Sequence, residues 1–352
     1  MVETVYRGEE SAVNPLFSVL VINWNGKLHL EECFDSVLGQ SFRNFESFLV
    51  DNASTDGSVE FVRERYGEKV CCLVLPGNLG FAGAYNVAIP KSRGAYVILL
   101  NNDTRVDRDW LRALAEAVAR HPDAGMFTPK VLEYADPERI DNTGHVIYRD
   151  GLSRGRHRLE RDDGRFDREE EVIFPSGCAG VYKREMLDRI GLLDEMFFSF
   201  GEDTELGLKG QWAGYRCYFV PVARVFHKYS ATWGKYSPEK VFLVERNRLW
   251  ILWKHFPVWN ILVSPWYTFR RYMYHLRGLL QKKGATYRFA EQHPAYKLAL
   301  ALVRAHGSAY VGLPRVLAQR KRLSSCRKIS STEFRRVLDR FGMSAEEVAM
   351  KD

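Results

Sequence analysis

The front of the chain alternates short apolar runs with stretches in which apolar residues recur every three or four positions. A run of about four to eight apolar residues that stops at polar ones is typical of a buried strand, and the wider spacing is typical of an amphipathic helix. Strands are predicted on this basis at residues 17–23, 48–50, 70–75, 95–100, 126–128 and 218–220. Helices are predicted at residues 28–38, after Asp56, up to Asn86 and after Asp107. This alternation predicts an α/β fold with a mostly parallel, doubly wound sheet flanked by helices.

Polar clusters follow several of the predicted strands. They are Asn23-Trp24-Asn25, Asp51-Asn52, Asn78 and Asn101-Asn102-Asp103. The carboxyl ends of parallel strands meet at one edge, which is where open α/β sheets bind ligands. No G-x-G-x-x-G follows the first strand and the sequence has no Walker A loop, so a glycine-rich phosphate cradle is excluded. We therefore expect side chains to form a binding site at this edge.

Asp103 follows the apolar run at residues 95–100 after two asparagines, Asn101 and Asn102. A carboxylate flanked by amides suits a hard divalent cation that keeps open positions for phosphate oxygens. The alternative is that Asn102-Asp103-Thr104 forms only a turn and a helix cap, for which these residue types are also typical. The repetition of polar clusters at one sheet edge favours the binding site.

Further candidates for chemistry lie in the middle of the chain. Residues 133–171 are polar and punctuated by glycines, which predicts hairpins or an excursion outside the core. After them, phenylalanines run straight into Glu202 and Asp203. A carboxylate beside aromatic rings has a raised pKa and can act as a base, although acidic residues also suit a helix start. His227 follows the last predicted strand and is either structural or a further metal ligand.

The last part of the chain differs in charge from the first. From Glu245 onward there are 21 Lys and Arg against 7 Asp and Glu, a net charge of +14. The whole chain has 51 and 44, so the first 244 residues hold 30 and 37, a net charge of −7. Tryptophan and tyrosine are interleaved with these cations, in a run too interrupted to span a bilayer. This combination suits either a membrane interface or ordinary packing on the sheet, and the aromatics favour an anionic membrane surface over nucleic acid.

Bulk composition limits the class of protein. With 352 residues, the chain is long enough for one large domain with an appendage, or for two domains. The six cysteines have no metal-finger spacing, which favours a reducing compartment. Residues 1–15 are polar, so we expect no secretory signal.

Taken together and in order, the motifs of residues 15–260 resemble the family 2 glycosyltransferases of the GT-A fold. The similarity is greatest to the rhamnosyltransferase-like members that build bacterial surface polysaccharides. The motifs are Val21-Ile-Asn-Trp-Asn-Gly26, Val50-Asp-Asn-Ala-Ser-Thr-Asp-Gly-Ser58, Asn78-Leu-Gly-Phe-Ala-Gly-Ala-Tyr-Asn86, Leu99-Leu-Asn-Asn-Asp-Thr104, Ser176-Gly-Cys-Ala-Gly180, Gly201-Glu-Asp203 and His227. The resemblance implies a Rossmann-like sheet at residues 1–244, with a nucleotide-binding half at about 15–130 and an acceptor half at about 131–244. Residues 245–352 would then form a basic, aromatic, helical tail.

The resemblance also implies roles for individual residues on the donor side. Asp51 would accept the imide N–H of uracil or thymine, because a carboxylate is an acceptor and the imide is a donor. The remaining residues implied to bind the nucleotide sugar are Asn23, Trp24, Asn25, Asp56, Asn78, Gly80, Asn86, Asn101 and Asn102. Asp103 and His227 would hold Mg²⁺ or Mn²⁺. Asn101 replaces the first acid of the family's D-x-D metal motif, which removes one negative charge.

The implied reaction is a single displacement that inverts the anomeric carbon. Asp203 would be the catalytic base that takes a proton from the acceptor hydroxyl, with Glu202 as its neighbour. Acceptor-side residues would be Gly177, Cys178, Ala179, Gly180 and Trp212. The resemblance suggests a dTDP-sugar as the donor, most often dTDP-L-rhamnose, with UDP-sugars as the alternative, and the expected acceptor is a saccharide or a polyprenyl-linked saccharide. The expected location is the cytoplasmic face of the cell membrane, with no nucleic acid as a partner.

Two other interpretations were weighed. A sugar-nucleotide pyrophosphorylase would carry a glycine- and arginine-rich loop after the first strand, where this chain has only Asn25-Gly26. A non-catalytic relative that binds nucleotide sugars as a scaffold is suggested by Asn101. Intact Asp103, Asp203 and His227 argue against it.

Overall fold

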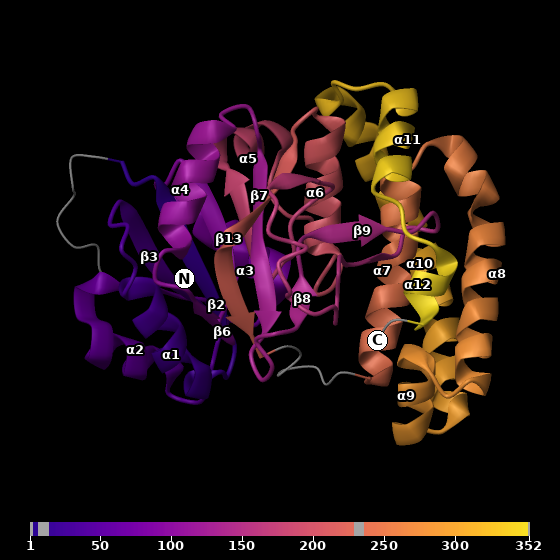
Figure 1. Cartoon of the computed structure of the whole chain (residues 1–352), viewed down its shortest axis with the longest axis horizontal. Helices are drawn as coiled ribbons and strands as arrows, with labels where there is room; N and C mark the ends of the chain where they lie inside the picture. The colour runs from indigo at the N-terminus through magenta and orange to yellow at the C-terminus, as the bar shows by residue number, and fades with distance from the viewer. Residues whose placement is uncertain (1–2, 6–13, 229–235, 351–352) are drawn as a thin grey trace.

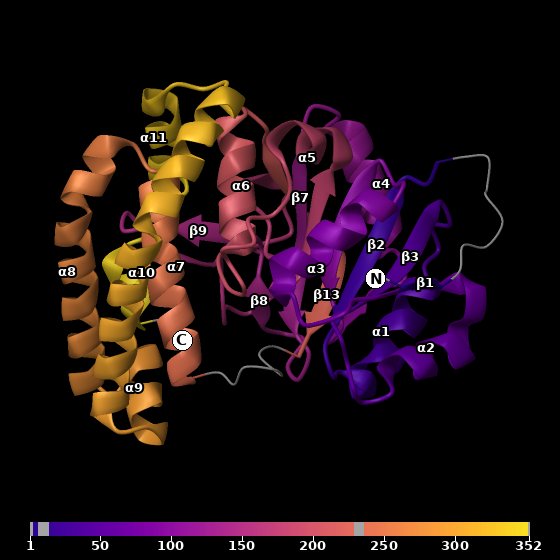
Figure 2. The ribbon, with the colours of Figure 1, turned by 180° about the vertical axis from the view of Figure 1, so that it is seen from behind.

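The computed structural model describes residues 3–5, 14–228 and 236–350 (Figure 1). Within this part of the chain, a central sheet with helices on both faces is followed by a group of helices packed at one end of the molecule (Figures 1 and 2). The α/β architecture with a C-terminal helical appendage, predicted from the sequence, is confirmed.

The central sheet has eleven strands within the described residues, in the order β1-β4-β3-β2-β5-β12-β7-β13-β11, with β6 paired to β13 and β8 to β7. Its first strands are β1 Glu3–Val5, β2 Phe17–Asn23, β3 Phe45–Asp51, β4 Cys71–Val74 and β5 Tyr96–Asn101. The others are β6 Thr104–Val106, β7 Met126–Glu133, β8 Ile140–Asn142, β11 Glu170–Val172, β12 Ala179–Lys183 and β13 Cys217–His227. A separate two-stranded sheet pairs β9 His145–Ile147 with β10 Ser153–Gly155.

The neighbouring strands β2, β3, β4 and β5 are parallel, as the sequence predicts. Their register pairs Asn23 with Asp51 and Ile22 with Asn101, so the polar strand ends lie at one edge. The sheet as a whole is mixed, because β12 runs antiparallel between β5 and β7. This reversed strand carries residues 176–178 back to the same edge, since Asn101 N–H donates to the carbonyl of Cys178.

Helices cover both faces of the sheet and bury alternate residues of each strand. In β2, Phe17, Val19 and Val21 face one hydrophobic cluster and Leu20 faces the other. The helices around the sheet are α1 Lys27–Leu38, α2 Ser58–Tyr66, α3 Gly80–Ala88, α4 Trp110–Arg120, α5 Arg184–Ile190 and α6 Glu202–Trp212, with short 3₁₀ turns at Gly67–Lys69 and Ile89–Lys91. The residues of α1 that set its predicted spacing are all buried: Leu30, Cys33, Phe34 and Val37.

Residues 133–171, predicted to lie outside the core, are partly buried, and this part of the prediction is wrong. Ile140 and Ile147 lie in hydrophobic clusters. Polar residues in the same stretch, Asp141 and Asp150, are buried because each pairs with a guanidinium group. The polar composition of residues 133–171 therefore did not indicate that part of the segment is buried, because its buried charges are paired within the fold.

A group of six helices with a short 3₁₀ turn follows the sheet within the described residues. They are α7 Pro238–His255, α8 Val258–Leu280, α9 Gly284–Gln292, α10 Ala295–Leu323, α11 Ser331–Arg340 and α12 Ala345–Met350, with the turn at Ser324–Cys326. Lys254 of α7 links this group to the sheet region through ion pairs, because its ammonium lies 2.6 Å from Asp194 and 2.7 Å from Glu205. None of the helices in the described part of the chain is both long and apolar enough to cross a membrane.

Candidate active site

A cavity of about 1020 Å³ begins at the carboxyl edge of β2, β3 and β5 and extends into the helical group. Its walls come from strand ends, from residues 141–158, from residues 176–178 and 198–203, and from helices α7 to α10 and α12. Most of the predicted site residues can be placed by reference to this cavity.

A chain of hydrogen bonds joins the strand ends behind the cavity wall. The Asn23 amide donates to Asp51 Oδ1 at 3.1 Å and to Ser54 at 3.0 Å, and Asn102 donates to Asn23 Oδ1 at 2.6 Å. Gly26 leaves room for this contact, because a Cβ there would lie 2.1 Å from the Asn102 amide. Asn23 and Asp51 are buried behind the wall, whereas Asn102 lines the cavity.

Asn52 organises the adjoining loop; the sequence placed it in a polar cluster with Asp51 but assigned it no binding role. Its amide donates to Asn78 Oδ1 at 3.0 Å, and its oxygen accepts from Leu79 N–H at 2.8 Å. Gly80 follows with a φ of +72°, and a Cβ there would come within 2.6 Å of the Phe198 ring. Asn52, Asn78, Gly80 and Phe198 all line the cavity, together with the half-exposed Trp24. The position of Asn52 beside Asp51 at a strand end was the feature of the sequence that could have identified it as a site residue.

Asp103 and His227 meet because β6 and β13 are paired, with Thr104 opposite His227. His227 Nε2 lies 3.4 Å from Asp103 Oδ1, and both side chains are buried at the cavity wall. The other ring nitrogen lies 2.9 Å from Asp141 Oδ2, and Asp141 also pairs with Arg158. Asp141 and Arg158 were missed because they come from the stretch that was predicted to lie outside the core.

This arrangement was compared with the requirements of a divalent cation. A metal-binding histidine typically has its second nitrogen bonded to a carboxylate, which orients the ring, and Asp141 provides this contact. In the described residues no group of three or more His, Cys, Asp or Glu side chains converges on one point. Asp103 and His227 thus offer two protein ligands, which fits a cation that also binds oxygen atoms of a substrate.

Asp203 and Glu202 lie in the first turn of α6 and line the cavity. Asp203 Oδ2 accepts from Gly177 N–H at 2.9 Å, and its Oδ1 accepts from Thr204 N–H at 2.6 Å. Burial raises the pKa of Glu202 well above its usual value, and the neighbouring Asp203 raises it further. Burial therefore disfavours the charged form of the Glu202 carboxyl.

His145 is an additional neighbour of Asp203 that the sequence did not reveal. Its Nε2 lies 3.9 Å from Asp203 Oδ2, and it lines the cavity. Burial lowers the pKa of His145, against the opposing charge of Asp203. The sequence around His145 does not single it out as a site residue, because a lone histidine in a polar stretch has many possible roles.

The predicted acceptor-side segment divides between the cavity and the core. Gly177 and Cys178 line the cavity, and a Cβ on Gly177 would lie 3.3 Å from Asp203 Oδ2. Ala179 and Gly180 belong to β12 and pair with β5. Trp212 lies in the core, where its ring stacks on Phe334 at 3.9 Å.

Besides the buried Asn23 and Asp51, three more residues predicted to bind the nucleotide sugar do not line the cavity and have other partners in the protein instead. Asn86 bonds to Leu193 and Glu195, which fixes α3 against the loop before α6. Asp56 accepts from Lys27 N–H and Ser58 N–H at the starts of α1 and α2. Asn25 accepts from Thr55 N–H at 2.7 Å. Asn101, by contrast, is on the wall beside Asn102.

Comparison with known proteins places this fold and site in a family. Residues 18–191 match the family model described as glycosyl transferase family 2. A Bacillus subtilis (strain 168) protein that carries the name teichuronic acid biosynthesis glycosyltransferase TuaG is 32% identical over 134 residues, which are 38% of this chain and 53% of that one. N-acetylglucosaminyl-diphospho-decaprenol L-rhamnosyltransferase of Mycobacterium tuberculosis (strain ATCC 25618 / H37Rv) is 25% identical over 262 residues, 66% of this chain and 85% of that one.

The fold has solved counterparts. Mannosyltransferase PcManGT of Pyrobaculum calidifontis, solved with GDP-Man and Mn²⁺, aligns with a TM-score of 0.52 and 18% identity over 90% of this chain and 86% of that one. Residues 18–191 therefore match a glycosyltransferase family 2 domain, and the chain has the GT-A fold. Among the strongest sequence matches, the chain spans 26%, 53% and 60% of the relative's own length.

Proposed function

We propose that the protein is a metal-dependent, inverting glycosyltransferase that moves a sugar from a nucleoside diphosphate sugar to a hydroxyl group of a lipid-linked saccharide. One observation carries this proposal: Asp103, His227 and Asp203, from three separate elements, line the same cavity. In this scheme the donor lies at the strand-end edge and the acceptor lies on the side of Asp203. The product would contribute to a cell-surface polysaccharide.

On the donor side, Trp24, Asn52 and Asn78 offer a ring face and amide groups to the nucleoside. Asp51 is fully buried, and its oxygens accept from Asn23 and Ser54. The base contact predicted for Asp51 therefore stays a prediction, and its observed role is to hold the strand ends together.

Between donor and acceptor, Asp103 and His227 would hold Mg²⁺ or Mn²⁺. Such an ion supplies Lewis-acid stabilisation of the negative charge that develops on a leaving diphosphate. The protein's own contribution is to fix the two ligands in place through Asp141 and the β6–β13 pairing. A mannosyltransferase of similar fold was solved with GDP-Man and Mn²⁺, which supports this choice of cofactor.

On the acceptor side, Asp203 would accept the proton of the attacking hydroxyl group. The hydrogen bonds from Gly177 and Thr204 fix its carboxylate at the cavity wall, so that it can face an acceptor. Attack from the face opposite the leaving group inverts the anomeric carbon in one displacement, by the same geometry as in single-displacement hydrolases. The burial of Asp103 and Glu202 favours transfer over hydrolysis, because a dry site excludes competing water.

The finer choice of substrates rests on similarity. The relative from Mycobacterium tuberculosis is named as a rhamnosyltransferase acting on a diphospho-decaprenol-linked sugar. We accordingly propose dTDP-L-rhamnose or a UDP-sugar as the donor, and a polyprenyl-linked saccharide as the acceptor. The protein would then work at the cytoplasmic face of a membrane.

A panel of nucleotide sugars tests the donor site directly. A ligand at a hundred times its Kd stabilises a folded protein by about 2.7 kcal/mol, which raises its Tm. We expect dTDP- or UDP-sugars to raise the Tm in the presence of Mn²⁺, and we expect chelation or Asp103→Asn to reduce the increase. No stabilisation by any nucleotide sugar would contradict the proposal.

A further inference from the structure

The cavity continues past the catalytic carboxylates into a second branch, enclosed by helices of the C-terminal group. We call this branch the helical chamber. Its apolar walls come from α7, α8, α9 and α10, and include Val241, Val244, Leu279, Phe289, Leu298 and Leu302. Ligand pockets typically have volumes of about 300–1,000 Å³, so a cavity of about 1020 Å³ has room for more than a donor sugar nucleotide.

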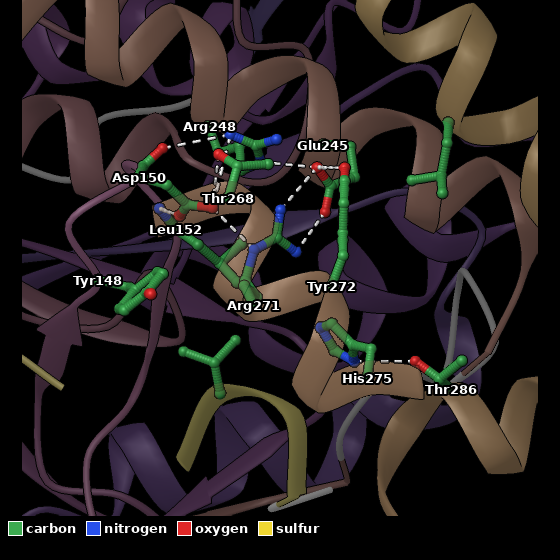
Figure 3. Close-up of polar contacts among 12 residues, drawn as sticks. Tyr148, Asp150, Leu152, Glu245, Arg248, Thr268, Arg271, Tyr272, His275 and Thr286 are labelled. Atoms are coloured by element: carbon green, nitrogen blue, oxygen red, sulfur yellow. Dashed lines mark hydrogen bonds and ion pairs between the residues drawn. The ribbon is translucent and has the colours of Figure 1, made fainter. Parts of the chain in front are cut away.

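Charged residues at the chamber's base are paired with one another, as Figure 3 shows. Arg271 of α8 binds both oxygens of Glu245 at 2.6 and 3.0 Å and donates to Asp150 at 2.8 Å. Arg248 of α7 donates to the same Glu245 at 2.6 Å. These contacts fix α7 against α8. Each of these two arginines is thus paired with a carboxylate. The base of the chamber therefore has no excess charge that would attract a charged ligand.

The remaining polar pair in this view is neutral. His275 Nδ1 lies 2.9 Å from Thr286 Oγ1, so α8 and α9 are joined across the chamber (Figure 3). Burial lowers the pKa of His275 to about 4, and Arg271 adds to the effect. The ring is therefore uncharged at neutral pH, which keeps this wall compatible with an uncharged ligand.

Two cationic side chains, Arg154 and Lys240, also line the cavity, and the Lys240 ammonium lies over the ring of Phe200, close in sequence to Asp203. Ser153 of β10 hydrogen-bonds to Thr204, the residue after Asp203, at 2.7 Å. The next residue, Arg154, donates to the carbonyl of Val348 on α12, and both Arg154 and Val348 line the cavity. Lys240, in the first turn of α7, lines the cavity as well. An anionic group that lies between Asp203 and the chamber would meet these two cations.

The chamber also leads towards the surface of α8. Leu276 lines the cavity and is half exposed. It belongs to a stripe of exposed apolar residues at alternating spacings of three and four: Trp259, Leu262, Trp266, Phe269, Met273, Leu276 and Leu280. An apolar ligand longer than the chamber can therefore continue along α8 without crossing polar surface.

We propose that the helical chamber binds the hydrocarbon chain of the acceptor, and that Arg154 and Lys240 bind the phosphate group that links this chain to the acceptor sugar. The proposal rests on the proposed function and adds the place where the lipid is recognised. A hydrocarbon chain is the occupant that suits apolar walls, a neutral polar pair and flanking cations at the end nearest the catalytic carboxylate. The sugar hydroxyl would then lie at Asp203.

Two substitutions on one helix provide a matched test. Leu298→Trp fills the chamber from α10, whereas Leu300→Trp adds the same ring at a position that is half exposed on that helix and does not line the cavity. Leu302→Trp is a second filling variant, used if the first lowers the Tm. The probes are n-decyl phosphate and n-butyl phosphate, titrated below the micellar concentration by calorimetry.

We expect wild type and Leu300→Trp to bind decyl phosphate more tightly than butyl phosphate, by up to about fourfold per additional buried methylene. The filling variants should lose at least tenfold in decyl phosphate affinity, with butyl phosphate affinity and nucleotide-sugar stabilisation unchanged. Equal binding of decyl phosphate by Leu298→Trp, Leu302→Trp and wild type would overturn the proposal.

Transfer assays then separate this proposal from the proposed function. Acceptors with one saccharide and either a short or a long alkyl diphosphate should differ in kcat/KM with wild type, and this difference should vanish in Leu298→Trp. Equal use of both acceptors by wild type would overturn the chamber proposal while leaving the transferase intact. Absence of nucleotide-sugar binding would instead count against the proposed function, and the alkyl phosphate titration would still decide the chamber.

Discussion

Neighbouring carboxylates in this protein have different environments, although they are adjacent in sequence. Glu202 is buried, and none of the described residues hydrogen-bonds to its Oε2. Asp203 is held by backbone N–H groups at the cavity wall. Burial disfavours ionisation of Glu202, and the backbone contacts that hold Asp203 at the cavity wall make Asp203 the candidate base. The residue pattern alone predicted the pair, and only the resemblance named Asp203 as the base, because the depth of each carboxylate in the fold cannot be read from the sequence.

The raised pKa of Glu202 has a consequence for stability. An acid whose pKa is raised by folding contributes most below its unfolded pKa of about 4.3, and that contribution is lost as the pH rises through the folded pKa. Glu202→Gln copies the protonated form and should remove this loss. We expect the Tm of the variant to exceed that of wild type by a margin that grows from pH 5 to pH 8. Parallel Tm curves would show that Glu202 is ionised in the folded protein.

Asp141 should position His227 for metal binding. Removing a carboxylate that orients a metal-binding histidine typically weakens metal affinity by about 10- to 100-fold. We expect this loss for Asp141→Asn, measured as Mn²⁺ affinity by electron paramagnetic resonance. Asp136→Asn, at an exposed pair with Arg139, is the control and should retain wild-type affinity. Unchanged Mn²⁺ affinity in Asp141→Asn would contradict the assignment of His227 as a ligand.

At the scale of elements, the strands and helices of the sheet region followed from the sequence, whereas the segment before β12 did not. Periodic apolar residues identified β2, α1 and β5, because each has one buried face or is buried throughout. The short strands and turns at residues 140–172 carry buried charges such as Asp141 and Asp150, whose partners lie far away in sequence. No local pattern reveals such partners.

The charged cluster at Glu245 should be a major source of cohesion between α7 and α8. Removing one partner of a buried ion pair costs about 3–5 kcal/mol, because the remaining charges stay buried without compensation. Burial opposes ionisation, but Arg248 and Arg271 hold the pKa of Glu245 well below its usual range. This stabilisation is present above the unfolded pKa of about 4.3 and is lost as the pH falls below it.

Glu245→Gln should therefore lower the free energy of unfolding by about 3–5 kcal/mol at pH 7, and by less at pH 4. Chemical denaturation provides the measurement. Glu291→Gln, at an exposed pair with Arg288 on α9, should change it by less than about 1 kcal/mol. A loss of less than about 1 kcal/mol for Glu245→Gln would show that the cluster is not needed for cohesion.

For the whole molecule, the sequence predicted an acidic first part and a basic, aromatic last part. The structure shows that the basic last part folds into helices α7 to α12. Exposed apolar residues, among them Trp259, Trp266 and Phe269, form a stripe along α8. Neither the stripe nor the chamber could be predicted from composition, because both depend on how α7 to α10 pack. The membrane contact inferred from the sequence stays a prediction, and the stripe on α8 gives it a specific surface.

Vesicle binding tests that surface. Replacing Trp266 and Phe269 together by serine should reduce co-sedimentation with anionic vesicles at least tenfold, because two exposed rings are removed from the stripe. Leu28→Ser, at an exposed apolar residue on α1, is the control and should bind as wild type does. Unchanged binding by the double variant would contradict the membrane assignment. If the double substitution instead dissociated a dimer, the stripe would be a helix-pairing surface.

The central claim is that the cavity catalyses glycosyl transfer with Asp203 as the base. Its most direct test is Asp203→Asn, assayed for sugar transfer and for nucleotide-sugar affinity in the same preparation, with Asp188→Asn on the exposed side of α5 as the control. We expect a fall in kcat of about 10²- to 10⁴-fold, with donor Kd unchanged, since the base acts on the acceptor. Retention of transfer, or a matching loss of donor affinity, would contradict it.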